Sequence, residues 1–189
     1  MDPREYLALA GQGFRTVLRA TDEDSWGRAT PCEGWTVWDL IGHVVVGNQR
    51  ATYLLGGASR ERTNALVAGD RLGEDPLGSF DRSLAAQADA FAEPGALERP
   101  CEIAIGQVPG RGLLQFRTVD LAVHAWDLAR AIGTDETLDP DLVDYLWRDI
   151  QPMVSVMGTM GVFGTGPSGT LREDASSQLK LLDASGRRP

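Results

Sequence analysis

Several features are scarce in this chain, and each scarcity argues against a class of protein. Long apolar runs are missing, since none approaches the ~20 residues that a membrane-spanning helix needs, and we expect no membrane partner. Basic residues are outnumbered, because 18 Lys and Arg face 27 Asp and Glu, which gives a net charge of −9. That charge, without a Lys/Arg cluster longer than the pair Arg187-Arg188, argues against a nucleic acid as partner.

Cysteine is also scarce, because Cys32 and Cys101 are the only two in 189 residues. So few cysteines fit a reducing compartment better than a secreted disulfide framework, and we expect no disulfide between them. The segment 1–5 has no basic stretch followed by an apolar one, so it does not resemble a signal peptide. We therefore predict a cytoplasmic protein.

What is present in the chain is typical of one globular domain. Hydrophobic residues make up 42% and charged residues 24% of the 189 positions, a length and composition that allow a full-sized core. No internal repeat or low-complexity segment divides the chain. We predict a single domain over residues 1–189.

Apolar side chains recur at spacings of three and four, the period of a helix that buries one face. This pattern predicts helices over residues 3–20, 37–55, 76–92, 110–132, 140–157 and 175–183. Thr36, with Asp39 three residues on, matches a capping box at the start of the second helix. Pro152 is expected to end or kink the fifth.

The segments between these helices carry turn signals. Residues 58–74 form a polar connection, 97–108 a short strand pair or an extended loop, and 158–169 a glycine-rich loop. The sequence therefore predicts an all-α fold with one extended excursion.

Histidine is also scarce, and the two present both fall on predicted inward helix faces. His43 lies between Gly42 and Gly47 on the second helix, where the glycines would let a ligand or a neighbouring helix approach. His124 lies on the fourth helix, four residues after Asp120. Because a helix turns about 100° per residue, these two side chains stand nearly in line, one turn apart.

Two imidazoles and one carboxylate from two helices make a candidate site for a divalent metal. Imidazole and carboxylate ligands suit zinc, nickel, iron or manganese better than calcium or magnesium. Three protein ligands leave positions open for water or substrate, which is the pattern of a catalytic zinc site. A metal there would lower the pKa of a bound water or thiol.

Simpler interpretations compete with a metal. A histidine on an apolar face is more often a hydrogen-bonded core residue than a ligand, and Arg117, three residues before Asp120, could pair with that carboxylate instead. Asp127 could orient His124 as a hydrogen-bond acceptor, or pair with Arg130. Cys32 could be a reactive thiol near the site, although a small packing residue is the more common role.

Two groups of motifs resemble a known family. Residues 30–37 (TPCEGWTV) with 39–44 (DLIGHV), and residues 117–120 (RTVD) with 124–129 (HAWDLA), resemble the mycothiol-dependent maleylpyruvate isomerase N-terminal domain family. Residues 178–189 are similar to the close of a single-domain actinobacterial branch that is described only as metal-binding. The resemblance spans nearly the whole chain.

The resemblance implies a DinB-like up-and-down four-helix bundle, within the DinB/YfiT-like superfamily, with a divalent metal at one end. Members of known activity are metal-dependent transferases or isomerases that use thiols such as mycothiol. Carried over residue by residue, the metal ligands fall on His43, Asp120 and His124. The isomerase itself has a glutamate where this chain has Asp120, and it carries a further C-terminal domain.

These observations support a main hypothesis and two alternatives. The first is a metal-dependent enzyme, zinc being the favoured ion, whose bound mycothiol-type thiolate attacks a small electrophile. Arg117 and Asp127 would then contact the thiol or its acceptor. The alternatives are a non-catalytic metal-binding or small-molecule-binding module, and a structural bundle whose polar residues satisfy one another. An apolar helix face could also form a homodimer.

Overall fold

The computed structural model describes residues 1–103, 106–154 and 166–189. These residues form two compact units, Met1–Glu136 and Thr137–Pro189, and each is described here by itself. One domain over residues 1–189 stays a prediction. Within the described residues, no helix is long and apolar enough to cross a membrane.

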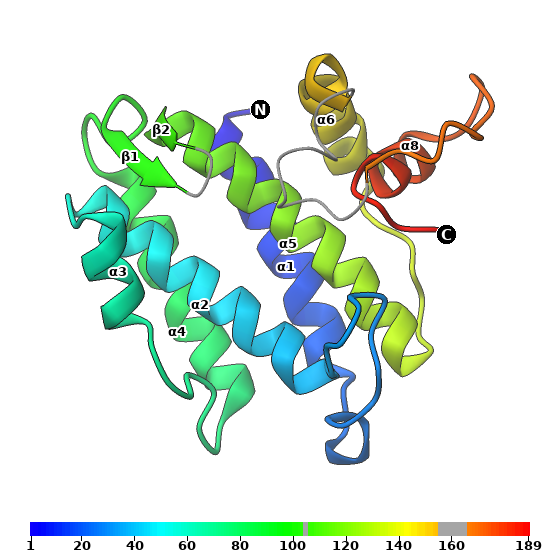
Figure 1. Ribbon diagram of the computed structural model, residues 1–189, viewed down its shortest axis with the longest axis horizontal. Helices are drawn as coiled ribbons and strands as arrows, with labels where there is room; N and C mark the ends of the chain where they lie inside the picture. The colour runs from blue at the N-terminus through cyan, green and yellow to red at the C-terminus, as the bar shows by residue number, and fades with distance from the viewer. Residues whose placement is uncertain (104–105, 155–165) are drawn as a thin grey trace. The chain divides into compact units, whose positions relative to one another are not determined.

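Among the described residues, the first unit contains most of the helices and a strand pair (Figure 1). Its elements in chain order are α1 (Pro3–Arg19), η1 (Glu23–Ser25), α2 (Val37–Leu55), α3 (Arg60–Leu66), α4 (Pro76–Ala92), β1 (Pro100–Ile103), β2 (Gly106–Pro109) and α5 (Gly110–Ile132). The second unit contains α6 (Pro140–Ile150), η2 (Gln151–Met153) and α8 (Ser177–Ala184).

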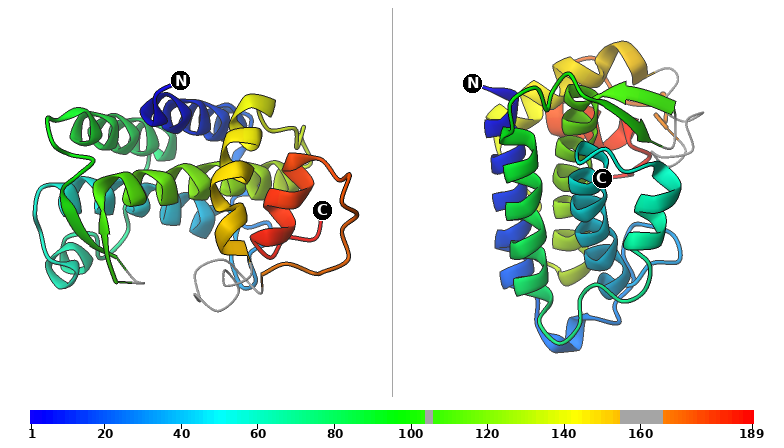
Figure 2. Two further views of the ribbon diagram at one scale, coloured as in Figure 1. Left: turned by 90° about the horizontal axis from the view of Figure 1, so that it is seen from above. Right: turned by 90° about the vertical axis from the view of Figure 1, so that its left-hand side faces the viewer.

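Four long helices of the first unit pack side by side, and the core lies between them (Figure 2). Helix α1 packs against α4 and α5, and α2 packs against the same two helices. Most side chains buried between them are apolar, among them Phe14, Leu40, Phe80, Leu121 and Trp126. The predicted all-α class is confirmed.

Helices α2 and α4 run in the same direction, because the connection through α3 carries the chain back before α4 begins (Figure 1). Leu72, ahead of α4, lies near Gly42 at the start of α2. Arg99, after α4, donates to the carbonyl of Leu55 at the end of α2. This parallel pair refines the expected up-and-down order, in which successive helices would alternate in direction.

The helix ends lie where the local signals predict them. Thr36 caps α2 in a capping box, with Thr36 Oγ1 accepting from the Asp39 amide at 3.3 Å and Asp39 Oδ2 accepting from the Thr36 amide at 2.9 Å. Helix α5 ends at Ile132 and is capped by Gly133, whose φ of 73° is the left-handed conformation that glycine adopts at low cost. Within the first unit, the predicted bounds of all four long helices are confirmed to within one residue.

Of the two alternatives for residues 97–108, a short strand pair or an extended loop, the structure has the strand pair: β1 and β2, the latter reaching Pro109, pair antiparallel with Cys101 opposite Val108. Helix α3 was not predicted within the polar connection 58–74. Ser59 caps it, but of its seven residues only Thr63 is buried, so it has no apolar face for a periodicity to reveal.

The second unit begins with α6, which ends at Ile150 and continues as the short 3-10 turn η2 around Pro152. Proline has no backbone N–H to continue the helical hydrogen bonds, which explains why the α-helix ends just before Pro152, as expected. The predicted end of this helix at residue 157, and residues 158–165 of the predicted loop, lie outside the described residues. Helix α8 confirms the predicted terminal helix.

Candidate metal centre

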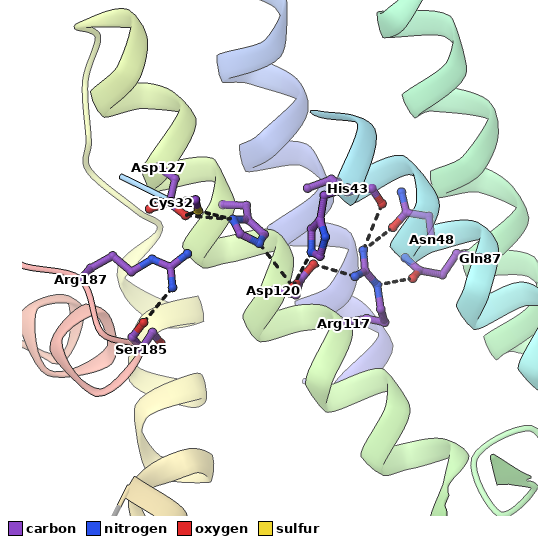
Figure 3. Close-up of polar contacts among 11 residues, drawn as sticks. Cys32, His43, Asn48, Gln87, Arg117, Asp120, Asp127, Ser185 and Arg187 are labelled. Carbon is purple, nitrogen blue, oxygen red and sulfur yellow. Dashed lines mark hydrogen bonds and ion pairs between the residues drawn. The ribbon is translucent and has the colours of Figure 1, made fainter. Parts of the chain in front are cut away.

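The two histidines and one carboxylate converge between α2 and α5 (Figure 3). His43 comes from α2, and Asp120 and His124 come from successive turns of α5. Asp120 Oδ1 lies 3.4 Å from His43 Nε2 and 3.5 Å from His124 Nε2. One ligand atom from each of the three residues lies within 4.8 Å of the other two.

These separations fit a bound ion as well as a hydrogen-bond network. Two ligands that each lie about 2.0–2.1 Å from a tetrahedral zinc are themselves about 3.3 Å apart. The two measured distances to Asp120 Oδ1 are close to that value. The His43 side chain is 33% exposed, whereas Asp120 and His124 are nearly buried, so the group can be reached from the His43 side.

Arg117 is buried beside the group and contacts one oxygen of Asp120. Its Nη1 donates to Asp120 Oδ2 at 2.6 Å, while Nε donates to Gln87 Oε1 at 3.1 Å and Nη2 to Asn48 Oδ1 at 2.8 Å. The rival ion pair therefore forms, yet it occupies only Oδ2. Oδ1 still faces His43 and His124, so the ion pair does not remove the carboxylate from the candidate site.

Gly47 makes room for this arginine. A Cβ built on Gly47 would overlap the Arg117 guanidinium, so no other residue fits there unless the arginine moves. The glycine that was expected to let a neighbour approach α2 thus admits a side chain of α5.

The charges of the group stabilise one another. Burial alone would raise the pKa of Asp120, but the Arg117 guanidinium and then His124 and His43 outweigh it and hold that pKa well below its usual range. Burial alone would lower the pKa of His124, but the Asp120 carboxylate and the hydrogen bonds to Asp120, Asp127 and Cys32 hold that pKa well above its usual value. Without metal, these shifts favour an ionised Asp120 and a protonated His124.

The opposite side of the His124 ring contacts Asp127. His124 Nδ1 lies 2.8 Å from Asp127 Oδ2, and the Asp127 side chain is fully buried. A carboxylate on the outer nitrogen of a histidine is the usual partner of a metal ligand, since it fixes the ring and directs the other nitrogen inward.

Trp35 and Cys32, neither of them a predicted metal ligand, also border the group. The Trp35 ring centroid lies 4.7 Å from that of His43 and 6.0 Å from that of His124. Cys32 Sγ donates to Asp127 Oδ2 at 3.3 Å. Their position in the first motif, residues 30–37, was the only sequence signal that linked them to the histidines.

Comparison with known proteins identifies the family. Residues 7–129 match the mycothiol maleylpyruvate isomerase N-terminal domain. The chain belongs to this family. Two uncharacterised proteins, from two strains of Mycobacterium tuberculosis, are each 34% identical over 144 residues, which is 75% of this chain and 74% of theirs.

Solved structures show the same fold. The crystal structure of the mycothiol-dependent maleylpyruvate isomerase matches with a TM-score of 0.62 and 23% identity, over 83% of this chain and 73% of that one. A histidine-to-alanine mutant of that isomerase matches with a TM-score of 0.64 and 22% identity, over 84% and 73%. The resemblance drawn from the two groups of motifs is thereby confirmed.

In this member of the mycothiol maleylpyruvate isomerase N-terminal domain family, the structure brings all five predicted site residues together. His43, Asp120 and His124 share one cluster, Arg117 contacts Asp120, and Asp127 contacts His124. Arg117 and Asp127 are turned toward protein groups and are 4% and 0% exposed. Their predicted contact with a thiol or its acceptor stays a prediction.

Proposed function

We propose that this chain binds one divalent metal ion through His43 Nε2, Asp120 Oδ1 and His124 Nε2. The observation that carries the proposal is the convergence of these three ligand atoms from two helices. Zinc is the favoured ion, and nickel, iron or manganese also suit two imidazoles and one carboxylate.

The surrounding residues would hold the ligands in place. Arg117 occupies Asp120 Oδ2, so the carboxylate offers its other oxygen alone. Asp127 occupies His124 Nδ1, so the ring offers Nε2. His43, the most exposed of the three ligands, leaves access for a small molecule. When bound, the ion would act as a Lewis acid that lowers the pKa of a coordinated thiol.

We infer further that the cosubstrate is a low-molecular-weight thiol of the mycothiol type. Family membership supports this, because the matching crystal structures are of a mycothiol-dependent maleylpyruvate isomerase. The reaction would be a metal-dependent thiol transfer or isomerisation in which the thiolate attacks a small electrophile. Trp35, over both imidazoles, would form one wall of the place where these molecules meet.

The first experiment is elemental analysis of the purified chain without an affinity tag. We expect about one zinc or other divalent ion per chain, and its loss in His124→Ala. Asp81→Asn is the matched control, because Asp81 pairs with Arg15 away from the cluster and its loss should leave the metal content unchanged. No metal in the wild-type chain, even after divalent ions are added, would refute the proposal.

Activity separates an enzyme from a binding module. The metal-loaded chain, mixed with mycothiol and a panel of electrophiles, should consume thiol faster than the His124→Ala chain does. A chain that binds metal and raises its melting temperature with it, yet consumes no thiol, would favour the non-catalytic alternative. Cytoplasmic localisation and the formation of a homodimer remain predictions.

A further inference from the structure

The turn that precedes α2 is held in one conformation by its own backbone. The Thr30 amide donates to the Trp35 carbonyl at 3.0 Å, and the Trp35 amide donates to the Cys32 carbonyl at 3.0 Å. Gly34 supplies the left-handed residue of the turn with a φ of 77°. The side chain of Cys32 is therefore presented from a defined position, and not from a loose loop.

That position places the thiol behind His124. Cys32 Sγ donates to Asp127 Oδ2 at 3.3 Å and lies 3.9 Å from His124 Nδ1. Asp127 Oδ2 is also the oxygen that contacts His124 Nδ1 at 2.8 Å. The thiol, the carboxylate and the imidazole thus form a chain of contacts that begins at the turn and ends at a proposed metal ligand (Figure 3).

We propose that Cys32 is a positioning residue of the metal centre. Its S–H donates to Asp127, and this contact holds the carboxylate against His124 Nδ1, which in turn directs His124 Nε2 toward Asp120 and His43. The inference rests on the proposed metal site and deepens it. It assigns a role to a thiol that the sequence alone left open between a packing residue and a reactive group near the site.

Cys32, His124 and Asp127 could also hold an ion of their own, since their ligand atoms lie within 4.8 Å of one another. The distances favour the hydrogen-bond chain. His124 Nδ1 and Asp127 Oδ2 are 2.8 Å apart, which is a hydrogen-bond length and shorter than the roughly 3.3 Å between two ligands of a tetrahedral zinc. A second ion would also require both nitrogens of His124 to bind metal.

The role is testable through metal affinity, measured by competition with a chelator for zinc. Cys32→Ala and the apolar Cys32→Val remove the donor. We expect each to weaken zinc binding by about 10-fold, which is the lower end of the range seen when a residue that supports a metal ligand is replaced. Cys32→Ser keeps a donor and should stay within about 3-fold of the wild-type affinity. Cys101→Ser is the matched control, because that thiol lies on β1, and it should not change the affinity.

A double-mutant cycle tests whether Cys32 acts through Asp127. In an Asp127→Asn chain, which has lost the carboxylate, Cys32→Ala should weaken zinc binding by much less than it does in the wild-type chain. An equal loss in both backgrounds would overturn the positioning role. All variants are compared without metal by thermal melting, so that a change in affinity is not confused with unfolding.

Cobalt separates the positioning role from direct ligation. Cobalt bound by nitrogen and oxygen alone lacks the thiolate-to-metal charge-transfer band, so we expect none in the wild-type chain. A band that disappears in Cys32→Ser would show that Cys32 is a ligand and would overturn the inference. If the wild-type chain and Cys32→Ala bind zinc equally, this inference alone fails; if the wild-type chain binds no metal, the proposed function fails with it.

Discussion

At the scale of single residues, the two carboxylate oxygens of Asp120 have different partners. Oδ2 contacts the Arg117 guanidinium at 2.6 Å, whereas Oδ1 faces the two histidines. The guanidinium keeps a nearly buried carboxylate ionised without competing for the oxygen that a metal would need. Arg117 and a metal are therefore compatible partners of Asp120, although the sequence presents them as rivals.

Gly47→Ala tests this arrangement, because the added methyl group would overlap the Arg117 guanidinium. We expect a loss of about 1–3 kcal/mol in the free energy of unfolding, as for other overpacked sites, and weaker zinc binding as Arg117 shifts from Asp120. Urea denaturation of the metal-free chain and zinc titration measure the two effects.

Gly13→Ala is the matched control for that variant. Gly13 also lies within a helix, but a Cβ there meets no atom within 4 Å, so alanine should stabilise the chain by about 0.5–1 kcal/mol. Equal effects of the two substitutions would contradict the close contact between Gly47 and Arg117.

At the scale of elements, the start of α2 both caps the helix and places side chains at the candidate metal site. The capping box of Thr36 and Asp39 begins α2, and the preceding turn carries Cys32 and Trp35. The same short motif thus starts the helix that bears His43 and supplies the side chains that border both histidines.

Thr36→Ala should lower the free energy of unfolding by about 1 kcal/mol, because the amide of Asp39 loses its acceptor at the helix start. Thr16→Ala is the control, since Thr16 lies exposed within α1 and alanine favours a helix interior. Urea denaturation of both variants measures the difference, and no loss on replacing Thr36 would count against the capping box.

At the scale of the whole molecule, pH should act in opposite ways on the metal-free chain and on metal binding. The raised pKa of His124 stabilises the metal-free fold fully below about pH 6.5, the unfolded value, and that contribution is lost as pH rises through the folded pKa. The depressed pKa of Asp120 contributes above about pH 3.9 and is lost as pH falls through its folded pKa.

Zinc affinity should instead rise with pH up to the folded pKa of His124, because the ion must displace the proton on His124 Nε2. Denaturation with a chelator present and zinc titrations at the same pH values measure the two trends. In His124→Ala the loss of metal-free stability above about pH 6.5 should shrink. An affinity independent of pH would argue against His124 as a ligand.

Metal removal should lower the melting temperature. An ion at 100 times its dissociation constant stabilises a folded chain by about 2.7 kcal/mol, which corresponds to roughly 5–10 °C for a chain of this size. Scanning calorimetry with zinc and after dialysis against a chelator measures the shift. The same treatment should leave His124→Ala unchanged.

The local sequence predicts a large part of this protein. The bounds of the long helices follow from apolar periodicity, from capping residues and from glycine or proline near the helix ends. Each of these signals involves residues that are close together in the chain. The spacing of Asp120 and His124 on one helix likewise follows from helix geometry alone. Helix α3 is not predicted from the sequence, because only one of its residues is buried and its sequence therefore shows no apolar periodicity.

The sequence by itself determined the four long helices of the first unit, the scarcity of histidine and cysteine, and the candidate ligands, because each depends on residue identity or on neighbours a turn apart. Only the tertiary structure decided that Arg117 and the histidines share Asp120 between its two oxygens. It also decided that the thiol of Cys32 meets Asp127, 95 positions away. Such contacts depend on how helices pack, and packing joins residues whose separation along the chain carries no local signal.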